Sequence, residues 1–243
     1  MRTTVTSRTT LITRTTRTTR IAGAAALACS LLLAGCASNE RAPNTIYDFG
    51  PAAPGAQAPG APALAAIVVM DATGPTALDT ERMFYRLNYA DAMQARTYAS
   101  ARWSAPPLDL FTHRIKTRLS QAGMQVLSAT DASNNVPILR IEVDDFVHAF
   151  ASAGQSEGQV RLRASVFTDH RLVDQRSFAR NAPAASHDAT GGAGALAAGT
   201  DLVAADLLAW LATLDPARLS PATGSGTAPA PASLGAMLRP SGR

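Results

Sequence analysis

One apolar run near the N-terminus restricts which part of this chain can fold as a domain. The run covers residues 21–34, about 14 residues, whereas a helix that spans a bilayer needs about 20. Residues 1–20, which precede it, contain five arginines and no acidic residue. A basic segment followed by a short apolar one is typical of a secretory signal peptide. We therefore predict that residues 1–35 are a signal peptide and that the folded part follows it.

The apolar run ends in Leu33-Ala34-Gly35-Cys36, which is an apolar residue and two small ones followed by cysteine. Small side chains let a signal peptidase reach the bond between Gly35 and Cys36, and the Cys36 thiol can then carry a thioether-linked diacylglycerol. At ~0.8 kcal/mol per buried CH₂, two or three acyl chains form a lasting anchor. Ala37, where Asp would favour retention at the inner membrane, favours the outer membrane. The sequence thus predicts a lipoprotein attached through Cys36 to the outer membrane and facing the periplasm. An ordinary secretory signal with a stray cysteine and a retained signal anchor are the alternatives.

Charge and cysteine content exclude several classes of function. The formal net charge of +4 includes the five leader arginines, so 17 of the 22 basic residues remain in the mature chain against 18 acidic ones. A nearly neutral chain gives no argument for nucleic-acid binding. Cys29 lies in the leader, which leaves Cys36 alone and excludes a disulfide scaffold or a thiolate zinc cluster within one chain.

Segments rich in proline, alanine and glycine delimit the folded region. Residues 36–65 are predicted to hold the anchor and a tether, with a short first strand at 47–50. Residues 216–243 begin at a helix-stopping proline and are predicted to be a disordered tail. Between them, residues 66–215 are expected to form a single domain.

Hydrophobic periodicity within that domain predicts an α+β fold, a mainly antiparallel sheet covered by two amphipathic helices. A β-bulge is expected at Asp144-Asp145, where the apolar phase shifts. Arg114, Lys116 and Arg118 are assigned to the polar faces of the first helix. A helix is the alternative for residues 90–100. The expected strands are 66–71, 82–88, 97–103, 124–129, 138–150, 159–168 and 171–180, and the expected helices run from Pro106-Pro107 to Gly123 and over 196–214.

No motif in the chain predicts catalysis or a cofactor. Gly154-Gln155-Ser156-Glu157-Gly158 matches a hydrolase nucleophile elbow, but such an elbow requires a strand-to-helix turn, and strands flank it here. We expect Ser156 at the tip of a hairpin, and no enzyme activity from it. The four histidines, His113, His148, His170 and His187, lack the spacing of metal ligands, and no phosphate-binding loop with a following lysine is present.

An ordered set of residues resembles one protein family. The set comprises the lipobox at 33–36, Tyr47-Asp48-Phe49-Gly50, Met83-Phe84-Tyr85-Arg86, Tyr98, Trp103, the Pro106-Pro107 pair and the closing helix at 196–214. It is similar to the ABC-type transport auxiliary lipoproteins, the outer-membrane partners of mammalian-cell-entry (MCE) lipid transport systems. The chain departs from the family's pattern in the Pro-rich insert at 51–65 and in a Gly-rich loop at 191–194.

The resemblance implies a non-enzymatic role. It implies a lipoprotein that docks a periplasmic MCE-domain protein, whose inner-membrane permease and ATPase move phospholipid or another hydrophobic molecule. It also allows a homo-oligomer. The alternative is a periplasmic lipoprotein that activates a peptidoglycan synthase or supports envelope integrity.

Aromatic residues concentrated at 83–103 predict the contact surface. Tyr, Trp and Arg supply much of the energy of protein interfaces. We therefore expect Tyr85, Arg86, Tyr89 and Trp103 at or beside a surface that meets an MCE partner or a neighbouring subunit. The alternative places Tyr85 and Trp103 in the core.

Overall fold

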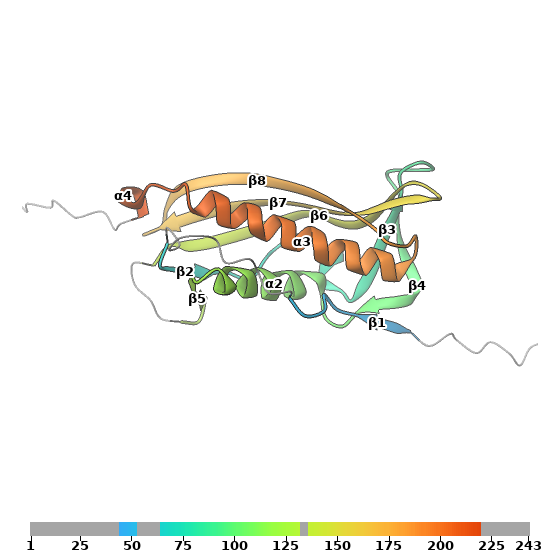
Figure 1. Ribbon diagram of the computed structural model, residues 1–243, viewed down its shortest axis with the longest axis horizontal. Coiled ribbons are helices and arrows are strands. Elements are labelled where there is room, and N and C mark those ends of the chain that lie inside the picture. Colours follow the sequence, from blue (N-terminus) through green and yellow to red (C-terminus); the bar gives the residue numbers. More distant parts are fainter. Residues whose placement is uncertain (1–43, 53–63, 132–135, 220–243) are drawn as a thin grey trace, which may run out of the picture. The chain divides into compact units, whose positions relative to one another are not determined.

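The computed structural model describes residues 44–52, 64–131 and 136–219 (Figure 1). The predicted signal peptide, Gly35, Cys36, most of the tether and the tail after residue 219 lie outside the described residues. The elements in chain order are β1 (Thr45–Tyr47), β2 (Ala66–Val69), η1 (Thr76–Asp79), β3 (Arg82–Leu87), β4 (Ala95–Trp103), α2 (Pro107–Gln121), β5 (Gln125–Ser128), β6 (Ile138–Ser152), β7 (Gln155–Thr168), β8 (Arg171–Pro183), α3 (Ala189–Leu211) and α4 (Pro216–Leu219).

One mixed sheet contains all eight strands. The long strands β6, β7 and β8 form an antiparallel meander, and β3 and β4 form a second antiparallel pair. On its other edge β6 pairs in parallel with β2 near its start and with β3 near its end. β5 extends the sheet beyond β2, and β1 extends it beyond β4. The register shifts between Val143 and Asp145, which confirms the predicted bulge.

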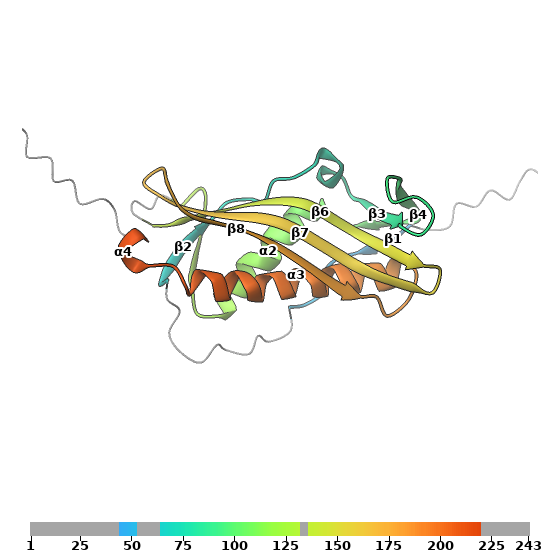
Figure 2. The ribbon, with the colours of Figure 1, turned by 90° about the horizontal axis from the view of Figure 1, so that it is seen from above.

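Helices α2 and α3 lie side by side on one face of this sheet, as Figure 2 shows from above. α2 packs beside β5, whereas α3 runs along β7 and β8. The fold is therefore α+β in a single domain with two long helices over a largely antiparallel sheet, as predicted. The side chains buried between the layers include Trp103, Trp210, Phe111, Ile67, Met83, Ile115, Leu119, Leu139, Leu162, Leu196, Leu207 and Leu211.

The closing helix starts earlier than predicted. α3 begins at Ala189 and ends at Leu211, whereas the sequence predicted 196–214 with a loop at 191–194. The Asp188 carboxylate accepts a hydrogen bond from the Gly191 amide at 2.9 Å and so caps the helix. A β-carbon on Gly192 would lie 2.4 Å from the His148 ring, so this glycine lets the helix lie against β6. The prediction of a Gly-rich loop at 191–194 was wrong. Gly192 is required by the close packing of α3 on β6 and not by a turn.

Hydropathy alone would give α3 a second interpretation. Among the described residues it is the one helix long and apolar enough to cross a membrane. Half of its apolar stretch is buried, and the helix packs on β7 and β8, so it is a core helix of this domain.

Three local predictions need smaller corrections. The first strand covers Thr45–Tyr47 and so starts before the predicted 47–50. Residues Ala95–Trp103 are a strand, which excludes the alternative helix over 90–100. The helix α4 occupies the first residues of the predicted tail.

Candidate functional site

Trp103, from the predicted contact surface, lies in the core. Its side chain is 1% exposed, and its ring centroid lies 5.5 Å from that of Phe49 and 6.0 Å from that of Phe146. These rings come from three separate parts of the chain and join β4, β6 and the segment after β1. Trp103 can therefore contribute to a contact surface only by supporting β4 from beneath.

The other three predicted contact residues lie on the β3–β4 hairpin but not on one face. Tyr85 is half-buried, with its ring centroid 4.7 Å from that of Tyr98. Neighbouring residues of a strand point to opposite faces, and Arg86 accordingly reaches Asp145, with hydrogen bonds of 3.0 and 3.4 Å. Tyr89 lies in the turn and is 53% exposed. Of the four predicted contact residues, Arg86 and Tyr89 are therefore the ones whose polar groups remain accessible at the surface.

A buried polar pair lies beneath the first turns of α3. The Tyr98 hydroxyl lies 2.8 Å from Nδ1 of His148, and the His148 side chain has no exposed surface. Its Nε2 has no hydrogen-bond partner. Burial, which disfavours the charged form, lowers the pKa of His148 to about 4 and raises the pKa of the Tyr98 hydroxyl. His148 is therefore neutral at pH 7 and holds no charge for binding or catalysis.

Ser156 lies within β7, one residue after its start, and not at the tip of the hairpin. Its hydroxyl lies 3.0 Å from Nδ1 of His187 in the loop before α3, a pairing that the sequence did not predict. A β-carbon on Gly158 would lie 2.6 Å from the backbone of Ala195, so this glycine serves the contact between β7 and α3.

The serine–histidine pair lacks the arrangement of a nucleophile elbow. Ser156 is buried in extended strand, whereas an elbow exposes its serine at a strand-to-helix turn. Asp188, next to His187 in sequence, uses its carboxylate to accept hydrogen bonds from the Gly191 amide and the Ser186 hydroxyl. The pair consequently ties the β7 start to the α3 loop.

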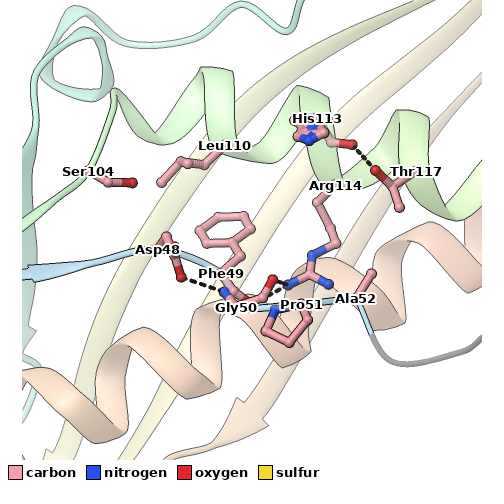
Figure 3. Close-up of a pocket in the computed structure, with 10 residues that line it drawn as sticks. All are labelled: Asp48, Phe49, Gly50, Pro51, Ala52, Ser104, Leu110, His113, Arg114 and Thr117. Carbon is pink, nitrogen blue, oxygen red and sulfur yellow. Dashed lines mark hydrogen bonds between the residues drawn. The ribbon is translucent and has the colours of Figure 1, made fainter.

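A clasp holds the segment through which the tether enters the domain (Figure 3). Phe49 is buried in the core, and the guanidinium of Arg114 donates hydrogen bonds to the carbonyls of Phe49 and Gly50, the latter at 3.0 Å. The hydroxyl of Tyr47 lies 2.9 Å from that of Thr190 on α3. These contacts join the segment to both α2 and α3.

Arg114 is a residue that sequence reasoning placed wrongly. It was assigned to a polar face of the helix, yet it is 5% exposed. Asp201 on α3 lies 3.7 Å from Nε of Arg114 and accepts two hydrogen bonds from Arg118, at 2.5 and 2.7 Å. Sequence reasoning could have predicted the burial of Arg114 from its spacing of three residues from Phe111, because that spacing puts Arg114 next to the apolar stripe of the helix.

The surface beside the clasp is hollowed but offers no metal site. The hollow measures about 490 Å³ and is open to solvent, and His113 and Asp48 are among the residues at its edge. Within residues 44–52, 64–131 and 136–219, no group of three His, Cys, Asp or Glu side chains could hold a metal ion.

Comparisons with known proteins agree with the fold. The family described as the ABC-type transport auxiliary lipoprotein component matches residues 47–207. Protein XCC0632 from Xanthomonas campestris, of family DUF330, has 22% identity over 68% of this chain and 94% of its own, with a TM-score of 0.59. An uncharacterized protein has 13% identity over 70% of this chain and 99% of its own, with a TM-score of 0.56. No curated protein sequence matches the chain.

The matched region runs from the tether clasp to the last turns of α3 and so covers most of the folded domain. The family match and the fold define the class of protein, an auxiliary lipoprotein component of ABC-type transport. The chain belongs to the family of ABC-type transport auxiliary lipoprotein components.

Proposed function

We propose that this protein is a non-enzymatic, outer-membrane component of an MCE-type lipid transport system. The family match over residues 47–207 carries the proposal, because the family's members are auxiliary lipoproteins of ABC-type transport. In this role the protein docks a periplasmic MCE-domain assembly, and an inner-membrane permease and ATPase drive the transport.

The membrane anchor in this proposal is a diacylated Cys36. Its support is the lipobox at 33–36 behind a basic segment and a short apolar run. Ala37 supports a position at the outer membrane, facing the periplasm. The clasp of Arg114 on the backbone of Phe49 and Gly50 suits a domain that is held by its N-terminal segment.

The docking surface in this proposal is the β3–β4 hairpin, with Arg86 and Tyr89 as contacts and Tyr85 and Trp103 as supports. Arg86 is held in place by Asp145, so its guanidinium is ordered before a partner binds. Tyr89 presents a half-exposed aromatic ring with a polar end, a residue type enriched at interface hot spots. A neighbouring subunit could meet the same hairpin in a homo-oligomer.

A pull-down with a periplasmic MCE-domain protein from the same organism tests the docking proposal. Arg86→Ala and Tyr89→Ala should each weaken capture about tenfold, corresponding to the loss of an interface contact of more than 1 kcal/mol. The thermal midpoint should stay within a few degrees, because neither side chain is buried in the core.

Arg163→Ala is the control, since it breaks another arginine–carboxylate pair, with Glu142, at a more exposed place on the sheet. Unchanged capture and unchanged size on a sizing column for both hairpin variants would contradict the docking surface. Capture of a peptidoglycan synthase in place of the MCE protein would favour the alternative function.

A further inference from the structure

Large hydrophobic side chains are exposed mainly at one end of the folded domain. Five of them are exposed among the described residues, and three lie on β1 or in the β3–β4 turn: Ile46 at 55%, Tyr89 at 53% and Met93 at 96%. Both views place this turn and the start of β1 at the same end (Figures 1 and 2). Leu172, by contrast, lies next to Arg171, which bonds to α4 at the opposite end.

The β3–β4 turn is also poor in charge. Between Arg86 and Arg96 the one charged residue is Asp91, whose carboxylate accepts a hydrogen bond from the Met93 amide at 2.9 Å. That bond holds the turn with the Met93 side chain fully in solvent. Depletion of charge around an exposed flexible thioether distinguishes this turn from an ordinary solvated loop.

The length of the tether brings this end of the domain close to the membrane. Cys36 and Asn44 are eight residues apart, so their separation is at most about 28 Å even in a fully extended chain. β1 pairs with the end of β4 at Ala101, and Ala101 is six residues from the turn, or about 20 Å along the strand. The tether is therefore long enough for the turn to touch the bilayer while Cys36 remains inserted.

From these observations we infer that the β3–β4 turn is a membrane-contacting loop that inserts Met93 into the lipid surface to which the protein is anchored. The inference concerns the Met93 side chain, which is 96% exposed, and leaves Tyr89, four residues earlier, to the protein contact of the proposed function. The inference rests on the lipid anchor of the proposed function. It adds that the domain has a defined orientation on the membrane.

One side chain suffices for this role because the anchor has already brought the domain to the bilayer. A soluble domain would need a much larger apolar area to bind lipid by itself. In an anchored domain the second contact, Met93, only has to favour one orientation over others. The anchor keeps Met93 at a high effective concentration near the lipid, so a weak contact is enough.

A position-specific fluorescent probe tests the inference independently of Cys36 acylation. The chain from residue 37 to 243 carries no cysteine, so Met93→Cys supplies a single thiol for an environment-sensitive dye. A hexahistidine tag before residue 37 anchors this protein to phosphatidylethanolamine–phosphatidylglycerol vesicles that contain nickel-chelating and nitroxide-labelled lipids. We expect blue-shifted emission and quenching by the nitroxide lipid at position 93.

Leu172→Cys, which replaces another exposed hydrophobic residue, is the matched control and should show neither effect. Equal emission and equal quenching at positions 93 and 172 on anchored protein would overturn the inference. A probe at position 93 whose emission does not respond to the vesicles but is shielded when the MCE protein is added would also overturn it, since Met93 would then belong to the protein contact. Because the tag replaces the acyl chains, either result leaves the lipidation of Cys36 to its own test.

Discussion

At the residue scale, His148 and Ser156 illustrate how burial changes the meaning of a polar side chain. In the sequence His148 is a histidine without the spacing of a metal ligand, and in the fold burial lowers the pKa of its imidazole to about 4. Ser156 belonged to a motif of catalytic enzymes, and it is a buried partner of His187. The burial of both side chains follows from their contacts near the start of α3, His148 with Gly192 and Ser156 with His187.

His148 predicts a loss of stability in mild acid. In the unfolded chain its pKa is near 6.5, and in the folded protein burial lowers that pKa to about 4. The unfolded state therefore binds the proton more readily, and the free energy of unfolding falls as the pH drops from about 6.5 to 4, by up to about 3 kcal/mol. Urea unfolding at several pH values should reveal this slope.

His148→Phe should flatten that pH dependence, because the aromatic ring remains and the titrating group is removed. An equal slope in the His148 variant would show that other groups cause the acid sensitivity.

Ser156→Ala should leave esterase activity at the background level and change stability only slightly. The variant loses one hydrogen bond to His187, worth about 1 kcal/mol. Hydrolysis of a chromogenic ester, measured beside the circular dichroism spectrum, checks both points. A clear fall in hydrolysis by a folded variant would mean that Ser156 is catalytic.

At the element scale, two glycines of α3 that are close in sequence differ in what surrounds them. A β-carbon on Gly192 would lie 2.4 Å from Nδ1 of His148, whereas one on Gly194 would meet nothing within 4 Å. Composition alone predicted one loop for this whole stretch. The structure makes it the first turns of a helix, in which one glycine contacts the sheet and another faces solvent.

Gly192→Ala and Gly194→Ala should therefore change stability in opposite directions. Gly192→Ala pushes α3 away from β6 and should lower the free energy of unfolding by about 2 kcal/mol, as overpacking of a core does. Gly194→Ala replaces a helical glycine without a clash and should raise it by up to about 1 kcal/mol. Thermal unfolding of the two variants side by side measures both effects, and equal shifts would contradict the close approach.

At the scale of the whole molecule, the proposed function places the tether, the clasp and the sheet in series between a membrane and a partner. The chain enters at β1, is held by Arg114 and continues into a sheet whose β3–β4 hairpin carries the proposed contacts. This order suits a domain that connects an anchor to a partner, as the proposed function requires.

Lipidation of Cys36 is the prediction on which this arrangement depends. Mass spectrometry of the mature N-terminus should find an acylated Cys36, and the Cys36→Ala form should accumulate as unprocessed precursor because the peptidase acts after lipid transfer. A mature N-terminus elsewhere and without acyl chains would contradict both the anchor and the membrane orientation.

The sequence by itself determined the features that depend on local chemistry and periodicity. Alternation along residues 138–168 predicted the β6–β7 hairpin and its bulge, and the spacing of Leu108, Phe111, Ile115 and Leu119 predicted α2. These patterns survive because a strand and a helix each bury one face whatever lies opposite. The family could likewise be predicted, since it depends on residues in a fixed order.

Tertiary structure alone decided which of those residues remain available to a partner. Trp103 is buried in the core, and Arg114 forms the clasp. Ser156 and His187, which are 31 residues apart, share a hydrogen bond. The neighbours of each could not be known from its local pattern, because they come from segments that are far away along the chain. Burial and hydrogen bonding depend on those neighbours, and so the site emerges only when the sheet and its two helices are packed together.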